Sequence, residues 1–160
     1  MNPTGLFYID GMDLWTVFSM FVEDGTDDFL KFAAKKESIT HDWKDSHGLD
    51  VDLSRVFLRE RDIDLRICFI VTSEADFWLK YKAFLAQMIL PGPRRLEPKS
   101  LGDEQFFCHY KECGNFTRFT PIKDTNLIGI KFNVTFVETN PAVDTTAVFI
   151  VDEDGRYLVT

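Results

Sequence analysis

The clearest pattern of hydrophobic and polar positions along the chain is an alternation over residues 61–71. Apolar side chains occupy every second position from Ile63 to Val71, and charged residues such as Asp62 and Asp64 lie between them. A period of two is typical of a β-strand that buries one face. At ~3.3 Å per residue this predicted strand is about 36 Å long, a length that suits the wall of a ring better than a compact enzyme pocket.

Residues 127–137 repeat the alternation, with Ile128, Phe132 and Phe136 among the apolar positions. We expect this segment to form a second long strand that pairs with the first in a half-buried sheet. The core is therefore expected to be mostly β.

Shorter strands are predicted on both sides of the first long strand. Residues 6–22 are apolar and aromatic, and Asp10-Gly11 interrupts them with a dipeptide that favours a hairpin turn. Residues 106–111 and 116–120 are predicted to pair around a Gly-Asn turn. The polar stretch that follows the first two strands has no clear period.

One amphipathic helix is predicted directly after the first long strand. Ser73 and Asp76 form an N-capping pattern, and apolar residues recur at helical spacing from Phe77 to Ile89, before a Pro-Gly-Pro sequence. Trp78 widens the apolar stripe beyond one face. We therefore expect the helix to be covered on two sides. Contacts between subunits of an oligomer would cover the second side.

The length of 160 residues fits one domain with a short extension. We expect a mainly β domain over residues 1–140, a β-sandwich or barrel-like fold flanked by the one helix. Residues 141–160 are expected to add a C-terminal hairpin, with strands at 147–151 and 156–159. A lone hairpin is marginal in water, so it should lean on its own domain or on a neighbour.

Composition and charge narrow the class of protein. The net charge of -8 and the isoelectric point near 4.8 oppose tight phosphate binding but suit a surface that DNA passes without sticking.

The N-terminus has no signal-peptide pattern and no apolar run reaches membrane-spanning length, so we expect neither secretion by that route nor a membrane span. Three cysteines form no disulfide framework and point to a reducing cytoplasm.

The chain lacks the P-loop, dinucleotide-binding, nucleophile-elbow and zinc-protease motifs. We expect no enzymatic activity, no catalytic residue and no cofactor. Cys108, His109 and Cys113, with His41 or His47, are the candidate metal ligands. Because structural zinc needs four converging ligands and adjacent strand residues face opposite sides, we expect no metal and free cysteines instead.

Three pairs of aspartates lie two positions apart in the chain: Asp50 and Asp52, Asp62 and Asp64, and Asp152 and Asp154. On a strand, such a pair places both carboxylates on one face, where they can hold a divalent cation or act as acid and base. Exposed strand positions and turns account for them more simply.

The main basic cluster consists of Arg94, Arg95 and Lys99, in a predicted loop over residues 93–104. On an acidic protein an isolated basic loop more often pairs with carboxylates of a partner or lies in solvent. We expect these three residues, together with Trp78, to contribute to a contact between subunits.

The order of elements resembles the N-terminal domain of distal tail proteins of long-tailed phages, and more broadly the tail-tube and baseplate-hub fold. The resemblance rests on residues 42–44, 48–54 and 59–65, followed by the helix at 74–89, and covers about residues 6–140. It implies six copies in a ring around a channel for the genome, within a phage or prophage tail.

The same resemblance implies the partners: other copies of this chain and the tube, tape-measure and hub proteins of the tail, with DNA only as passing cargo and no membrane. The protein would be made in the bacterial cytoplasm and reside in the virion tail. Many distal tail proteins continue into a carbohydrate-binding-like or galectin-like domain, whereas this chain stops after one hairpin, so a position in the distal tail, the tube or an adaptor stays open. The alternatives are a small β-sandwich binding module for carbohydrate or protein, and a monomeric tail-assembly chaperone.

Overall fold

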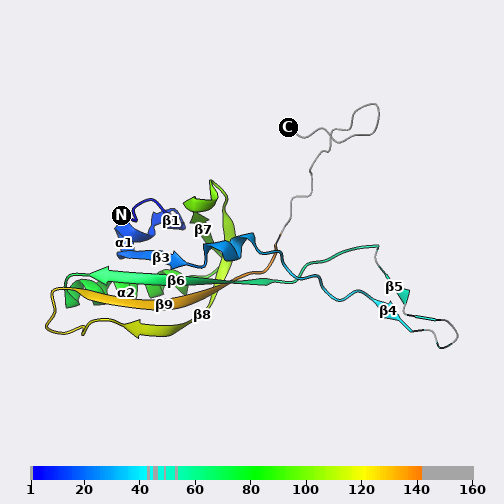
Figure 1. The fold of residues 1–160 in the computed structure, drawn as a ribbon. Helices are drawn as coiled ribbons and strands as arrows, with labels where there is room; N and C mark the ends of the chain where they lie inside the picture. The colour runs from blue at the N-terminus through cyan, green and yellow to red at the C-terminus, as the bar shows by residue number, and fades with distance from the viewer. Residues whose placement is uncertain (1, 43, 45–46, 49, 53, 142–160) are drawn as a thin grey trace, which may run out of the picture.

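The computed structural model describes residues 2–42, 44, 47–48, 50–52 and 54–141. Its seven-stranded antiparallel sheet has the order β2-β1-β7-β8-β9-β6-β3, and one long helix packs on it (Figure 1), so the predicted mainly β fold with a flanking helix is confirmed. The predicted C-terminal hairpin lies outside the described residues. The elements are β1 (Phe7–Ile9), β2 (Met12–Asp13), α1 (Leu14–Phe18), β3 (Met20–Asp24), the 3₁₀ helix η1 (Thr26–Leu30), β4 (Thr40–His41), β5 (Asp50–Val51), β6 (Arg61–Val71), α2 (Glu74–Met88), β7 (Arg94–Pro98), the 3₁₀ helix η2 (Lys99–Leu101), β8 (Phe106–Arg118) and β9 (Ile128–Glu138).

The two long strands predicted from the alternating pattern are β6 and β9, and they pair as expected. Their register runs without a break from Arg61 opposite Glu138 to Val71 opposite Ile128. Every second side chain of each strand enters the core, and Phe132 is only 1% exposed. This pair is the central axis of the fold.

The predicted helix is α2, and it covers the inner face of the central strands. The Ser73 hydroxyl accepts a hydrogen bond from the backbone N–H of Asp76 at 3.2 Å, which caps the first turn. Phe77 and Phe84 are buried beneath the helix, where their rings meet Phe69 and Phe132 at centroid distances of 5.1 and 6.2 Å. No helix in the described part of the chain is long and apolar enough to cross a bilayer.

The prediction of a hairpin over residues 106–120 is wrong, because one strand, β8, runs from Phe106 to Arg118. The Gly-Asn pair makes a bulge instead of a turn. Asn115 adopts a positive φ of 52°, and the register against β9 shifts between Gly114 and Thr117. The extra residues are absorbed within the ladder, so the chain bends without reversing.

The prediction of a loop over residues 93–104 is also wrong, because this segment contains β7 and η2. β7 lies between β1 and β8, and its Leu96 is fully buried. Within β7, two arginines, one glutamate and one proline conceal any alternation. The strand depends on backbone bonds to both neighbours, which a local pattern does not reveal.

The turn predicted at Asp10-Gly11 is confirmed, with φ of 52° and 81° at the two residues, as a tight hairpin between β1 and β2 requires. The segment after β2 differs from the prediction, because Leu14–Phe18 forms the short helix α1 before β3 begins. Asp13 caps this helix by accepting a hydrogen bond from the Trp15 backbone N–H.

The Asp10 carboxylate joins three elements of the fold. It accepts hydrogen bonds from the side-chain nitrogen of Gln87 on α2 at 2.5 Å, from Arg94 Nη1 at 3.0 Å and from the backbone N–H of Arg95 at 2.9 Å. Because the Arg94 side chain is only 9% exposed, this carboxylate is its main source of charge compensation. The hairpin, the helix and β7 are thereby held in one arrangement.

We predict that Asp10→Ala lowers the free energy of unfolding by about 3 kcal/mol, because it leaves the buried Arg94 guanidinium without its counter-ion. Asp13→Ala is the matched control: it removes another aspartate of the same hairpin, whose cap contributes about 1 kcal/mol. Urea denaturation followed by circular dichroism measures both variants. Equal losses would contradict the role assigned to Asp10.

Candidate interaction surfaces

The most prominent feature outside the sheet is a two-stranded extension formed by residues 33–60, which we call the arm. Its two chain segments are joined by backbone hydrogen bonds from Lys36 to Phe57 at 2.8 Å and from Arg59 to Ala34 at 2.7 Å, and farther out by the pairing of β4 with β5. Figure 1 shows the arm projecting away from the end of the sheet where β6 begins. The sequence pattern predicted no regular element in its first half.

The arm exposes large apolar side chains along its length. Ile39 is 79% exposed, Val56 60% and Phe57 62%, and Phe32 at the root is 95% exposed. An isolated two-stranded hairpin is marginal in water, and clustered apolar exposure of this kind marks contact surfaces. These side chains make the arm a candidate contact surface.

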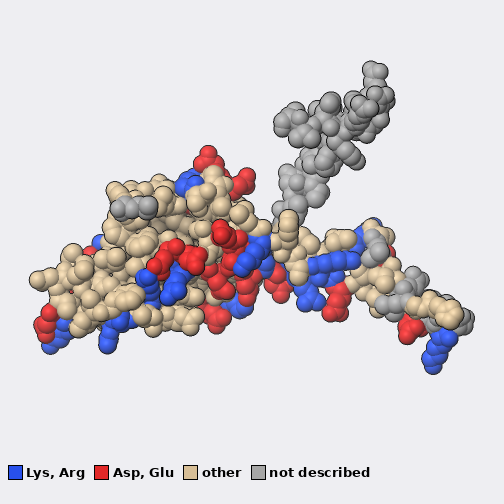
Figure 2. Space-filling model, viewed as in Figure 1, with Lys and Arg blue, Asp and Glu red and all other residues tan. Residues whose placement is uncertain are grey.

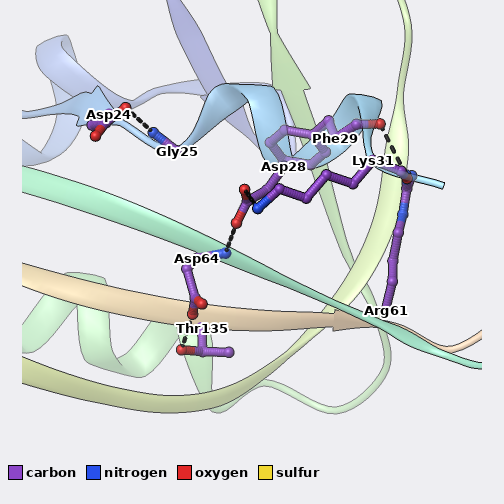
Figure 3. Close-up of polar contacts among 8 residues, drawn as sticks. All are labelled: Asp24, Gly25, Asp28, Phe29, Lys31, Arg61, Asp64 and Thr135. Carbon is purple, nitrogen blue, oxygen red and sulfur yellow. Dashed lines mark hydrogen bonds and ion pairs between the residues drawn. The ribbon is translucent and has the colours of Figure 1, made fainter. Parts of the chain in front are cut away.

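A guanidinium group fixes the root of the arm to the central strands. Arg61, the first residue of β6, donates from Nη1 to the carbonyl oxygens of Phe29, at 3.0 Å, and of Lys31 (Figure 3). Its Nε pairs with the carboxylate of Glu138, the last residue of β9, at 2.5 Å. The side chains of Arg61 and Glu138 are 16% and 12% exposed, so this pair is largely withdrawn from water. One side chain therefore links both long strands to the chain entering the arm.

A second group of polar contacts holds η1 against β6. The Asp28 carboxylate accepts a hydrogen bond from the backbone N–H of Asp64 at 3.0 Å, and the Asp64 carboxylate accepts one from the Thr135 hydroxyl (Figure 3). Partial burial opposes ionisation of Asp28, but the contacts with Lys31 and the Asp64 backbone outweigh it and hold the pKa of Asp28 below its usual value. Asp64 thus makes a hydrogen bond within the sheet through its carboxylate, and one to the root of the arm through its backbone N–H.

The closest approach at the root is made by a glycine. Gly25 begins η1 with a φ of 98°, and a Cβ at this position would lie 2.0 Å from the backbone oxygen of Asp64. The Asp24 carboxylate accepts a hydrogen bond from its N–H at 2.8 Å. Only a residue without a side chain fits between the arm root and β6.

The other aspartate of the Asp62 and Asp64 pair is also engaged, since Asp62 pairs with Lys111 of β8 at 2.6 Å. Asp64, Glu112, Asn133 and Thr135 line a polar depression of about 380 Å³ on the outer sheet face. Figure 2 shows acidic side chains gathered over the body of the molecule and basic side chains along the near part of the arm. The acidic body is a surface that does not attract a polyanion.

An aromatic groove of about 400 Å³ lies at the opposite end of the sheet from the arm, between α2, β8 and β9. The rings of Phe77 and Tyr81 stack at 5.7 Å, and Trp78 meets both edge to face. The groove is lined by Phe77, Trp78, Tyr81, Phe116, Arg118, Ile122 and Ile130. Trp78 and Phe116 are 42% and 54% exposed, so the groove is an open apolar surface.

The structure separates the four residues predicted from sequence for a contact between subunits. Trp78 lines the aromatic groove. Arg94, Arg95 and Lys99 lie together on β7 and η2, where acids of the same chain neutralise them: Asp10 pairs with Arg94 at 3.0 Å, and Glu97 pairs with Arg95 at 2.8 Å and Lys99 at 3.4 Å. Their role between subunits stays a prediction, with Arg94 already buried within the chain.

Sequence reasoning missed the remaining groove residues and the exposed side chains of the arm. Because Phe116 and Arg118 were expected in a hairpin, their position beside α2 was not predicted. The one usable signal was Trp78, which broke the single-faced pattern of the helix.

None of the three cysteines belongs to the arm or lines the groove. Burial raises the pKa of the Cys108 thiol to about 12, which keeps it protonated at neutral pH, while its neighbour His109 is exposed on the other face. In the described ranges no three side chains of His, Cys, Asp or Glu lie together in a way that would hold a metal ion. The arm and the groove are therefore the candidate functional surfaces.

We predict that Gly25→Ala lowers the free energy of unfolding by more than 1 kcal/mol, because the new Cβ strikes the Asp64 carbonyl and the positive φ is strained. Gly92→Ala is the matched control, since its φ of 83° carries the same strain while its Cβ would meet nothing within 4 Å. Urea denaturation of both variants isolates the steric contribution. A loss at Gly25 no larger than at Gly92 would contradict the close packing of the arm root.

No protein-family model matches the chain, and no curated protein matches it. Solved structures of similar fold include the crystal structure of the SPP1 Dit (gp 19.1) protein, described as a paradigm of the hub adsorption apparatus in phages that infect Gram-positive bacteria. The match has a TM-score of 0.52 and 13% sequence identity, and it covers 82% of this chain and 49% of that chain. The match therefore spans about half the length of that protein, and over this span the two chains share a fold.

Proposed function

We propose that this chain is a non-catalytic structural subunit of a phage or prophage tail, a distal tail or baseplate component that assembles into a ring of six copies. The observation that carries the proposal is the combination of a fold like that of a phage hub adsorption protein with a projecting arm that exposes Ile39, Val56 and Phe57. These apolar side chains are exposed in the single subunit, so the arm supplies surface for a contact with another subunit.

The charge distribution supports a wall along which DNA passes. The chain carries a net charge of -8, although on the outer face of β6, β8 and β9 the acids Asp62, Asp64 and Glu112 lie among Arg66, Lys111 and Lys131. The net negative charge of the chain repels the phosphate backbone, which opposes adhesion. In this proposal the partners are other copies of the chain and the tube, tape-measure and hub proteins of the tail, and the protein resides in the virion tail.

The aromatic groove favours a second candidate function, that of a binding module. Exposed Trp78 and Phe116 beside Arg118 offer flat apolar faces and a charged donor, as sites for carbohydrates or peptides do. Such a module needs no self-association, so the oligomeric state separates the two candidates.

We predict that light scattering over a concentration series shows one discrete closed oligomer of the 18.5 kDa chain, six copies in the ring proposed here. A mass that reaches a plateau with concentration indicates closure. Open-ended growth would move the assignment to the tail tube. A strict monomer at every concentration would contradict self-assembly and favour the binding module.

A further inference from the structure

We propose that residues 142–160, which we call the C-terminal segment, bind the root of the arm of their own chain. In this contact the apolar run at 147–151 covers a pocket at the root, and the acids at 152–154 meet basic side chains on the near part of the arm. The inference goes beyond the proposed function and does not depend on it, because the contact lies within one chain.

The pocket at the root of the arm, which we call the root pocket, has a volume of about 560 Å³. It lies between η1, the first residues of the arm and the adjoining ends of β6, β8 and β9. Two of its apolar side chains are largely uncovered, since Leu30 is 63% exposed and Phe32 95%. A pocket of this size takes a ligand or a peptide segment, and these side chains favour an apolar occupant.

The described part of the chain ends at this pocket. β9 ends at Glu138, whose carboxylate pairs with Arg61, and Pro141 contributes to the pocket wall. The C-terminal segment therefore starts at the rim of the root pocket. Its apolar run begins six residues after Pro141, which is about 20 Å in extended conformation. A segment held by so short a connection has an effective concentration on the order of mM, so even a weak contact is populated.

The apolar run fits the exposed floor of the pocket. Its sequence is Ala-Val-Phe-Ile-Val, with Phe149 at the centre. Covering Phe32 and Leu30 with this run removes apolar side chains of both partners from water. The contact also gives the hairpin predicted for the C-terminal segment the support that an isolated hairpin lacks.

The charges of the near part of the arm and the C-terminal segment are opposite. Residues 33–36 and 55–60 contain four basic residues and one acid, a net charge of +3 on a chain of net charge -8 (Figure 2). The C-terminal segment contains four acids and one arginine, a net charge of -3. Such complementarity favours the contact and fixes its direction.

Three of the basic side chains have no acid of the described chain beside them. Lys35, Lys36 and Arg55 are exposed and make no ion pair with any described residue. The order of residues also agrees, because four positions separate Phe32 from Lys36 and four separate Phe149 from Glu153. A C-terminal segment that runs outward from the root pocket thus places its aromatic ring on Phe32 and its acids beside the lysines.

The first test is cross-linking of the full chain with a carbodiimide, which joins a lysine amine directly to a neighbouring carboxylate. Unlabelled and isotope-labelled chains are mixed in urea and refolded together, so that mass spectrometry separates links within a chain from links between chains. We expect links within one chain from Lys35 or Lys36 to the acids at 152–154. Lys82 and Lys123 are the controls, since both are exposed and lie outside the arm, and they should stay unlinked to these acids.

The second test compares Phe32→Ser with Phe116→Ser, which removes an exposed phenylalanine at the opposite end of the sheet. Phe32→Ser should lower the yield of these cross-links about tenfold, because the apolar half of the contact is lost. Hydrogen exchange of residues 147–151 should become about tenfold faster in the same variant. Phe116→Ser should leave both readouts at the wild-type level.

Links between chains in place of links within a chain would overturn the proposal and assign the root pocket to the C-terminal segment of a second copy. Links spread evenly over Lys82, Lys123 and the lysines of the arm would overturn it as well. Exchange at 147–151 that Phe32→Ser leaves unchanged would do the same. In each of these cases the proposed function stands, because neither readout depends on a ring.

Discussion

The uninterrupted antiparallel pairing of β6 with β9 is the constraint on which the rest of the structure depends. Each residue from Arg61 to Val71 has its partner on β9, so the two strands behave as one rigid axis. One face of this axis forms the core under α2 and the other is polar. The two ends differ: Arg61 and Glu138 anchor the arm at one end, and the aromatic groove opens at the other. The length of the pair therefore sets the distance between the two candidate contact surfaces.

Buried charges fix the shorter elements around this axis. Asp10 joins the first hairpin to α2 and β7, and Arg61 joins η1 to the long strands. Such pairs add specificity of arrangement, because breaking one leaves a charge without compensation in a poorly hydrated place. The apolar core supplies the stability, and the polar contacts direct the arm.

Sequence patterns predicted the elements whose register is determined locally. β6 and β9 follow from alternation over eleven positions each, and α2 follows from its cap and helical spacing. The prediction failed at β7 and at the bulge of β8, where pairing with strands distant in the sequence decides the conformation. The sequence pattern did not predict the arm, for the same reason. Of the candidate site, Trp78 was identified because it violates the helical pattern, whereas the basic cluster gave no hint that Arg94 pairs internally with Asp10.

The central claim is that the arm is covered when copies of the chain assemble. Hydrogen exchange measured at low and high protein concentration tests it directly, because covered segments exchange more slowly. We predict that protection rises with concentration in the described arm amides, such as Lys36 and Arg59, while the β6 and β9 amides stay protected throughout. Protection that rises elsewhere on the sheet, with the arm unchanged, would contradict it.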